Sequence, residues 1–135
     1  MRLAICAGAP DLEAPVDGRF GRCACFVLVD PESGEWEAVE NPAATASGGA
    51  GAEATRFLAG RGVKAVVLGN VGPNAAAALE AMEVEIYTAH PGTARENLER
   101  YRQGDLSRVS GPTVDSHFGA QSGRRRGKRG DSSRN

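Results

Sequence analysis

The sequence predicts an α/β protein built on a five-stranded mixed sheet with helices packed on it. Two short strand-like runs near the N-terminus are joined by a Pro-Glu-Ser-Gly turn, which is typical of an antiparallel hairpin. From residue 50 onward, helical and strand-like patterns alternate, which is typical of parallel strands joined by right-handed crossovers. The length of 135 residues fits one domain, and 41% hydrophobic with 24% charged residues is an ordinary composition for a folded domain.

The first three predicted elements are strands. Residues 2–7 (RLAICA) form a short apolar run of the kind found in buried strands. Residues 25–30 (CFVLVD) are rich in β-branched and aromatic side chains, which favour strands. Residues 35–40 (EWEAVE) alternate in polarity. A loop rich in glycine, proline and aspartate, residues 8–22, separates the first strand from the hairpin.

The rest of the fold is predicted to alternate helices and strands. The expected elements are a helix over 50–61, a strand over 63–68, a helix from 73, a strand over 84–87 and a helix from 93. Pro73 suits the first position of a helix, and Thr93 with Glu96 matches a capping box. The helix faces expected to pack on the sheet are Ala50, Ala54, Phe57 and Leu58; Ala75, Ala78, Leu79 and Met82; and Ala94, Leu98 and Tyr101.

The chain divides into a folded domain, residues 1–106, and a C-terminal tail, residues 107–135. The tail has no hydrophobic period, and from about residue 120 it is expected to be disordered. Residues 124–135 carry six basic side chains and one acid, whereas residues 1–123 carry 10 basic and 16 acidic groups. The sequence therefore predicts an acidic domain with a basic tail.

Cellular location is predicted from two features of the chain. No apolar run reaches the roughly 20 residues needed to cross a bilayer, and the N-terminus does not match a signal peptide. Three cysteines are an odd number, so reduced thiols are expected rather than a disulfide framework. We therefore expect a cytoplasmic protein that makes no contact with membranes.

One edge of the predicted sheet collects the residues that could bind a ligand. If the first strand runs upward, three helix N-termini and several glycines lie together at the top edge, where open α/β sheets bind ligands. Helix N-termini carry free N–H groups and partial positive charge, which suits an anion. The alternative is that these glycines only make tight turns. The edge gathers Cys6, Cys23, Cys25, Gly48 to Gly51, Gly69, Asn70, Gly72 to Asn74 and His90.

Five side chains are candidates for metal ligation, thiol redox chemistry or direct contact with an anion. Cys23 and Cys25 are two residues apart, so strand alternation would place both thiols on one face, where they could ligate a soft metal or remain inert in the core. Their spacing is also compatible with a thiol redox pair, although redox pairs normally have two residues between the cysteines. His90 is either a solvated loop residue or a ligand. Arg19 and Arg22 could hold an anion.

The motifs of common catalytic sites are absent from the sequence. There is no phosphate-binding Gly-x₄-Gly-Lys-Ser/Thr loop and no Gly-x-Ser-x-Gly nucleophile turn. No acid, base and nucleophile gather in the predicted site strands. We therefore expect a binding protein and not an enzyme.

Several segments together resemble the dinitrogenase iron–molybdenum cofactor biosynthesis family, which includes NifX-like and NafY-like carriers and the C-terminal part of NifB. The segments occur in order over about residues 1–119, and each is a weak signal alone. They are 16–23 (VDGRFGRC), 26–30 (FVLVD), 40–42 (ENP), 48–51 (GGAG), 69–75 (GNVGPNA) and 111–119 (GPTVDSHFG).

The resemblance implies a ribonuclease H-like fold and a carrier of an anionic metal–sulfur cluster. The cluster would be the iron–molybdenum cofactor, its precursor or a related iron or molybdenum sulfide, and cofactor-assembly proteins would be the partners. The predicted metal ligands are Cys23, Cys25 and His117. The predicted cofactor-binding residues are Arg19, Phe20, Gly21, Arg22, Gly48, Gly49, Gly51, Asn70, Gly72, Asn74 and His90.

The basic tail supports an alternative function. A cluster of arginines attracts nucleic acids or other anionic partners through salt-dependent contacts. However, the domain is acidic, and no aromatic residue interrupts the basic run to stack on bases. Binding of nucleic acid is therefore the alternative hypothesis, and binding of a metal–sulfur cluster is the preferred one.

Overall fold

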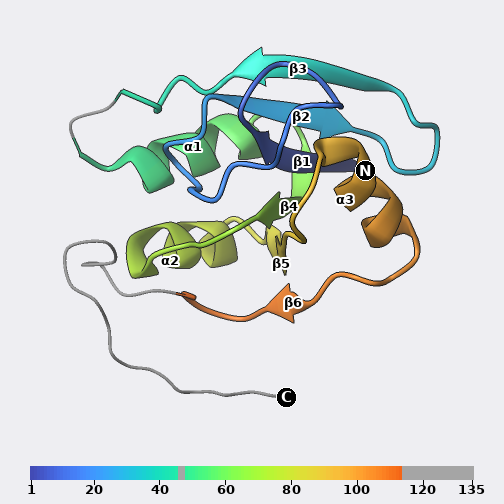
Figure 1. Cartoon of the computed structure of the whole chain (residues 1–135). Coiled ribbons are helices and arrows are strands. Elements are labelled where there is room, and N and C mark those ends of the chain that lie inside the picture. The colour runs from blue at the N-terminus through green and yellow to red at the C-terminus, as the bar shows by residue number, and fades with distance from the viewer. Residues whose placement is uncertain (46–47, 114–135) are drawn as a thin grey trace.

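The protein folds around a single six-stranded mixed sheet. The computed structural model describes residues 1–45 and 48–113. Its elements are β1 (Arg2–Ala7), β2 (Cys25–Val29), β3 (Trp36–Glu40), α1 (Ala50–Ala59), β4 (Val63–Leu68), α2 (Pro73–Ala81), β5 (Glu85–Thr88), α3 (Ala94–Arg102) and β6 (Arg108–Val109), shown in Figure 1. The strand order across the sheet is β3-β2-β1-β4-β5-β6.

The strand pairing confirms both parts of the predicted topology. β1 pairs antiparallel with β2, which pairs antiparallel with β3. On its other side β1 pairs parallel with β4, and β4 pairs parallel with β5. The mixed character of the sheet follows from this order, since the hairpin lies on one side of β1 and the crossover strands on the other.

The predicted number of strands was wrong by one, because the sequence analysis missed β6. This strand has two residues and pairs antiparallel with β5, with Val109 opposite Ile86. Two residues are too few to show the alternation that identifies a strand in a sequence. The strand exists because the edge of β5 offers free backbone groups for pairing.

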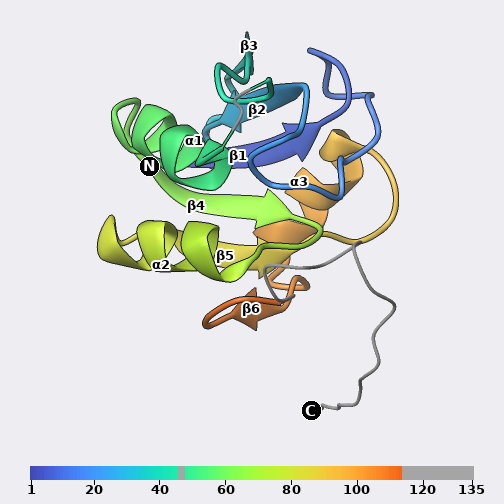
Figure 2. The same ribbon diagram turned by 90° about the vertical axis from the view of Figure 1, so that its left-hand side faces the viewer.

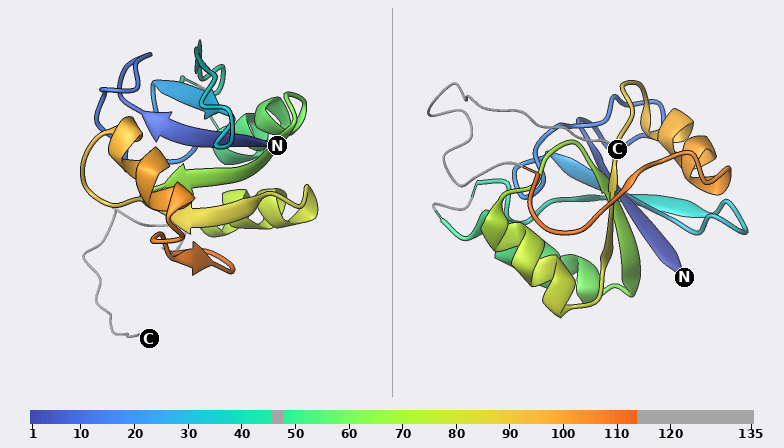
Figure 3. Two further views of the ribbon diagram at one scale, coloured as in Figure 1. Left: turned by 90° about the vertical axis from the view of Figure 1, so that its right-hand side faces the viewer. Right: turned by 90° about the horizontal axis from the view of Figure 1, so that it is seen from below.

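The helices lie on both faces of the sheet. α1 and α2 cover one face side by side, and α3 covers the other (Figures 2 and 3). No helix in the described part of the chain combines the length and apolar character of a membrane-spanning segment. The two helix-covered faces give the molecule two separate cores.

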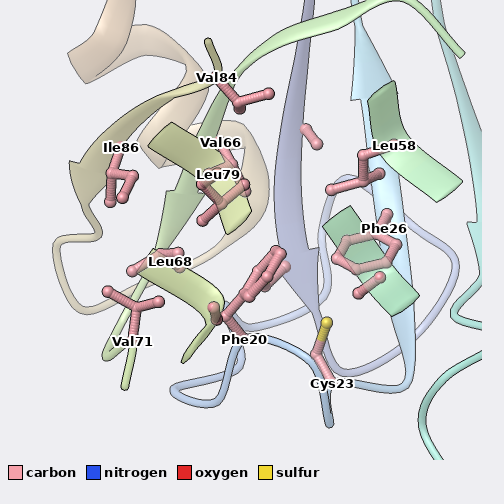
Figure 4. Packing of buried hydrophobic residues seen from close by; sticks show 14 of the residues in the cluster. Phe20, Cys23, Phe26, Leu58, Val66, Leu68, Val71, Leu79, Val84 and Ile86 are labelled. Carbon is pink, nitrogen blue, oxygen red and sulfur yellow. The ribbon is translucent and has the colours of Figure 1, made fainter. Parts of the chain in front are cut away.

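The core beneath α1 and α2 contains most of the large buried side chains. Phe26 is fully buried at its centre and contacts the rings of Phe20 and Phe57, with centroid distances of 6.1 and 6.4 Å. Figure 4 shows Phe20 and Cys23 at one end of this cluster, with the sulfur of Cys23 pointing into it. This end of the core lies beneath the loop that connects β1 to β2.

The helix boundaries confirm most of the sequence signals. Thr93 and Glu96 form the predicted capping box at the start of α3, and Pro73 is the first residue of α2. The predicted apolar face of the second helix was wrong at Met82, which is 43% exposed. α2 ends at Ala81, so Met82 lies beyond its last turn, and Ala76 is buried on the helix face instead.

Candidate functional site

A groove of about 470 Å³ lies between the N-termini of α1 and α2, beside the loop that connects β1 to β2. The two helices lie side by side on one face of the sheet (Figure 1), and each follows the C-terminal end of a strand, α1 that of β3 and α2 that of β4. The groove is therefore at the sheet edge where the topology predicts a ligand. Its lining residues are Gly18, Arg19, Phe20, Arg22, Gly49, Ala50, Gly51, Ala52, Asn70, Gly72, Pro73, Asn74 and Ala75.

The N-termini of both helices present backbone N–H groups to this groove. The first intrahelical hydrogen bonds are donated by Glu53 to the carbonyl of Gly49 and by Ala76 to the carbonyl of Gly72. The N–H groups of residues 50–52 and 74–75 therefore have no partner within their own helices. In the part of the chain that the structure describes, no side chain caps either N-terminus. Together they make a cradle of donors with partial positive charge.

The side chains of the groove add positive charge to these donors. Within residues 1–45 and 48–113, the charged residues that line the groove are Arg19 and Arg22, and none of its lining residues is acidic. The Arg19 guanidinium is mostly exposed and lies 3.4 Å from an Asp17 oxygen, while Arg22 donates to the carbonyl of Ala44 at 3.4 Å. Both arginines are long enough to turn toward a ligand. The groove is thus suited to an anion.

A second hollow on the same side of the sheet has the opposite charge. It measures about 400 Å³ and lies between α2, β5 and β6. Glu80, Glu83 and Glu85 line it, with Arg108 as the basic residue. An anion would be repelled there, so the groove between the helix N-termini is the better candidate for the predicted ligand.

Gly51 allows the two helix N-termini to approach each other closely. A Cβ at position 51 would lie 2.5 Å from the Cβ of Ala75. A Cβ at Gly21 would lie 3.1 Å from the Cα of Gly51. The loop, α1 and α2 are therefore packed together at the groove through backbone contacts. Glycine at position 51 is explained by packing.

Gly72 differs from Gly51 because a side chain at position 72 would not clash with any neighbouring residue. It precedes α2 with φ of −82° and ψ of 177°, a conformation that any residue adopts. A Cβ there would have no heavy atom within 4 Å. A serine or aspartate at this position would also cap α2, as these residues do at many helix N-termini. The absence of a side chain keeps this part of the groove open to a ligand.

Asn41 holds the loop that forms one side of the groove. Its side chain is buried, and its amide nitrogen donates to the carbonyls of Gly21 and Cys23, both at 3.0 Å. Its amide oxygen accepts the N–H of Ala43 at 2.9 Å. The sequence analysis names Asn41 only within the 40–42 segment of the family resemblance and assigns it no role, although an asparagine between a strand and a proline is a recognisable turn signal.

Cys6 and Cys23 lie in the core beneath the groove, and none of the three cysteines lines the groove itself. Cys6 and Cys23 are fully buried, and Cys25 is 5% exposed. Burial raises the pKa of the Cys6 thiol, and the neighbouring Cys23 raises it further. Burial also raises the pKa of Cys25, together with Glu40.

The strand alternation used to place Cys23 and Cys25 on one face does not apply. β2 begins at Cys25, and the chain bends at Ala24. Cys23 packs in the core beneath α1 and α2 with Phe26. Cys25 has the register of Val27, whose side chain packs in the core on the α3 side. The predicted arrangement was wrong because Cys23 lies outside the regular strand.

His90 and the N-terminus of α3 are held apart from the groove. His90 is exposed, and its backbone N–H and carbonyl both bond to the buried side chain of Asn97, at 2.8 and 2.9 Å. α3 packs on the opposite face of the sheet from α1 and α2 (Figure 2). The prediction that three helix N-termini share one site is therefore wrong: two of them line the groove, since α3 belongs to the other layer.

The structure brings together eight of the predicted ligand-binding residues. They are Arg19, Phe20, Arg22, Gly49, Gly51, Asn70, Gly72 and Asn74. Gly21 lies below them against Gly51, Gly48 adjoins Gly49 without lining the groove, and His117 lies outside the described residues. Ala50 and Pro73, which the sequence places at this edge without assigning them a binding role, also line the groove, whereas sequence reasoning missed Gly18, Ala52 and Ala75. Residues 1–45 and 48–113 contain no cluster of three or more His, Cys, Asp or Glu that could hold a metal ion.

Comparison with known proteins places the chain in a family. The family model described as dinitrogenase iron-molybdenum cofactor matches residues 1–104. The chain belongs to this family. The match includes every residue that lines the groove, so this dinitrogenase cofactor family protein has its candidate site within the family's shared region.

Solved structures and a curated protein are also similar to this chain. The apo form of the orange protein from Desulfovibrio gigas is 37% identical, with a TM-score of 0.80, over 84% of this chain and 96% of that one. A candidate NifB protein from Thermotoga is 35% identical, with a TM-score of 0.74, over 84% and 97%. An uncharacterized protein of Methanocaldococcus jannaschii is 30% identical over 92 residues, which are 66% of this dinitrogenase cofactor family chain and 78% of the relative.

Proposed function

We propose that this protein binds an anionic metal–sulfur cluster in the groove between α1 and α2 and carries it during cofactor assembly. The observation that supports the proposal best is the meeting of two helix N-termini in one groove, where the described part of the chain supplies two arginines, no acidic lining residue and no side-chain cap. Such a cradle binds negative charge without bonding to the metal. A carrier must release its cargo, and backbone hydrogen bonds suit release better than several metal–thiolate bonds.

Membership in the dinitrogenase cofactor family supports the class of ligand. The iron–molybdenum cofactor, its precursor and related iron or molybdenum sulfides are the clusters proposed. Cofactor-assembly proteins are the proposed partners, the cytoplasm is the proposed location, and the role is that of a carrier and not of a catalyst. The ribonuclease H-like assignment of the fold and the division at residue 106 stay predictions.

Direct ligation of the cluster by thiols also stays a prediction. Cys23 has no exposed surface, so its sulfur reaches the groove only if the loop that Asn41 holds moves away from the core. His117 lies outside the described residues. In the proposed resting complex, the cluster is therefore held by N–H groups and arginines. A thiolate bond to Cys23 would require a second, more open state of the loop.

Anaerobic reconstitution tests the proposed function. The protein would be incubated with iron and sulfide, with and without molybdate, desalted, and examined by visible spectroscopy and metal analysis. We expect a stoichiometric cluster that is retained after desalting. A colourless, metal-free protein under all conditions would contradict the proposal.

Charge-neutralised variants locate the binding site. The double variant Arg19→Gln/Arg22→Gln should retain at least tenfold less cluster, because each lost charge-assisted hydrogen bond is worth roughly 1.5–3 kcal/mol. The matched control is Arg95→Gln/Arg100→Gln, which removes the same charge from α3, where both arginines pair with exposed acids. The control should bind like the unmodified protein. Equal losses in both variants would indicate a general charge effect and contradict this placement.

A further inference from the structure

Both backbone polar groups of Val71 bond to a residue 42 positions later. Val71 lies between β4 and α2 and is 1% exposed, so its N–H and carbonyl need partners within the protein. The N–H donates to the Oγ1 of Thr113 at 2.8 Å, and the carbonyl accepts the N–H of Thr113 at 2.9 Å. Thr113 therefore holds the segment that leads into the N-terminus of α2.

The same hydroxyl is connected to the opposite wall of the groove through Asn70. The Thr113 hydroxyl donates its one hydrogen to two acceptors, the side-chain oxygen of Asn70 at 3.4 Å and the carbonyl of Val71 at 3.3 Å. The backbone N–H of Asn70 donates to the carbonyl of Gly18 at 3.0 Å, and its carbonyl accepts the N–H of Phe20 at 3.4 Å. Asn70, Gly18 and Phe20 all line the groove. One residue outside the groove thus supports both walls.

From these contacts, and resting on the proposed function, we infer that Thr113 is a positioning residue for the anion-binding groove. Its hydroxyl keeps Val71 and Asn70 in place, and through them it sets the distance between the N-terminus of α2 and the 18–20 loop. The donors on the two walls then face the same ligand. Thr113 lies beyond residue 104, where the family match ends, so this support comes from a later part of the chain.

Binding of a simple anion tests this inference in the full-length chain. The probe is the tetrathiomolybdate dianion, a soluble mononuclear metal–sulfur anion. Thr113→Val keeps the shape of the side chain but removes the hydroxyl, and we expect about tenfold weaker binding, which corresponds to a hydrogen bond of about 1.4 kcal/mol. Thr113→Ser restores the hydroxyl and should bind within about twofold of the unmodified protein.

Thr93→Val is the matched control for loss of a threonine hydrogen bond. Its hydroxyl accepts the N–H of Glu96 at 3.1 Å and caps α3 on the other face of the sheet. This control should lower the melting temperature and leave anion binding unchanged. If Thr113→Val binds as tightly as the unmodified protein, or if Thr113→Ser does not restore binding, the inference is overturned.

An NMR measurement separates this inference from the proposed function. In Thr113→Val, amide exchange at Val71 should accelerate, and the amide chemical shifts of Gly18 and Phe20 should change across the groove. Changes confined to Val71 and its sequence neighbours would overturn the positioning role. If the unmodified protein binds neither the probe nor a reconstituted cluster, the proposed function fails, and the NMR result still decides whether Thr113 sets the groove walls.

Discussion

At the scale of single residues, the groove uses two glycines for different physical reasons. Gly51 is required by packing, since a side chain there would overlap Ala75. Gly72 is required by neither conformation nor neighbours, and it lies where a ligand would approach α2. Substitution of the two glycines therefore separates stability from binding.

Gly51→Ala should destabilise the protein, whereas Gly72→Ala should weaken ligand binding alone. The added methyl at position 51 overpacks the helix contact, which typically costs about 1–3 kcal/mol. At position 72 the methyl enters open space and reduces access to the N–H groups of α2. Urea unfolding and cluster retention after desalting measure the two effects. A Gly72→Ala protein that retains the full amount of cluster would show that the ligand does not approach this position.

Because the three thiols are buried, we expect them to react slowly with alkylating reagents in the folded protein. Burial raises the pKa of Cys6 above its ordinary value of 9.0, so less thiolate is present at pH 8. The three cysteines should react with iodoacetamide much more slowly in the native protein than in urea. The Cys6 thiol loses its proton at a higher pH in the folded state than in the unfolded state. The free energy of unfolding should therefore fall as the pH rises above 9. Rapid native labelling of Cys6 would show that β1 and its neighbouring loop open readily.

At the scale of elements, α3 depends on one buried polar side chain. Asn97 is fully buried, and it bonds to the backbone of His90 and to the carbonyl of Thr93 at 3.0 Å. These contacts tie the loop after β5 to the first turn of α3. The loop with His90 is therefore a structural connection on the face opposite the groove.

Asn97→Ala should lower the free energy of unfolding by about 2–4 kcal/mol, because several buried backbone groups lose their partner at once. Cluster retention by the remaining folded protein should be unchanged, since Asn97 and the groove lie on opposite faces of the sheet. Urea titration and the reconstitution assay together check this expectation. A loss of cluster binding without a loss of stability would place α3 at the ligand site.

The sequence predicted elements with strong local signals and missed those that depend on the tertiary structure. The proline that opens α2 and the capping box of α3 act within a few residues, so they were recognised. β6 and the bonds of Thr113 to Val71 come from partners far away in the chain, and neither leaves a periodic pattern. Within the groove, Arg19 and Asn74 have recognisable side chains, whereas Ala52 and Ala75 have small apolar side chains and could not be identified from residue type.

At the scale of the whole molecule, an anion must approach a protein of negative charge. Residues 1–113 carry 10 basic and 15 acidic side chains, whereas the two charged residues that line the groove are both arginines. The basic residues after position 120 offset most of this charge, which leaves the full chain at −1. The positive charge of the tail thus increases the long-range attraction between the protein and an anionic ligand.

Neutralising the tail should slow ligand association at low salt. Arg124→Gln/Arg125→Gln/Arg126→Gln lowers the net charge by three, and we expect association of the tetrathiomolybdate dianion to slow several-fold at about 10 mM salt. Above about 0.5 M salt the difference should disappear, because charges more than a few ångströms apart are then screened. Stopped-flow absorbance measures both rates. A loss that persists at high salt would indicate direct contact between tail and ligand.

The meeting of α1 and α2 through Gly51 has a consequence for how such proteins diverge. When a binding surface consists largely of main-chain donors, the identity of its side chains does not indicate which ligand it binds. Substitutions around the rim can then alter which anion is preferred while the cradle itself persists. Proteins that share this fold can therefore come to bind different anions while the backbone of the groove stays the same. A comparison restricted to the side chains that contact the ligand would not show that such proteins are related.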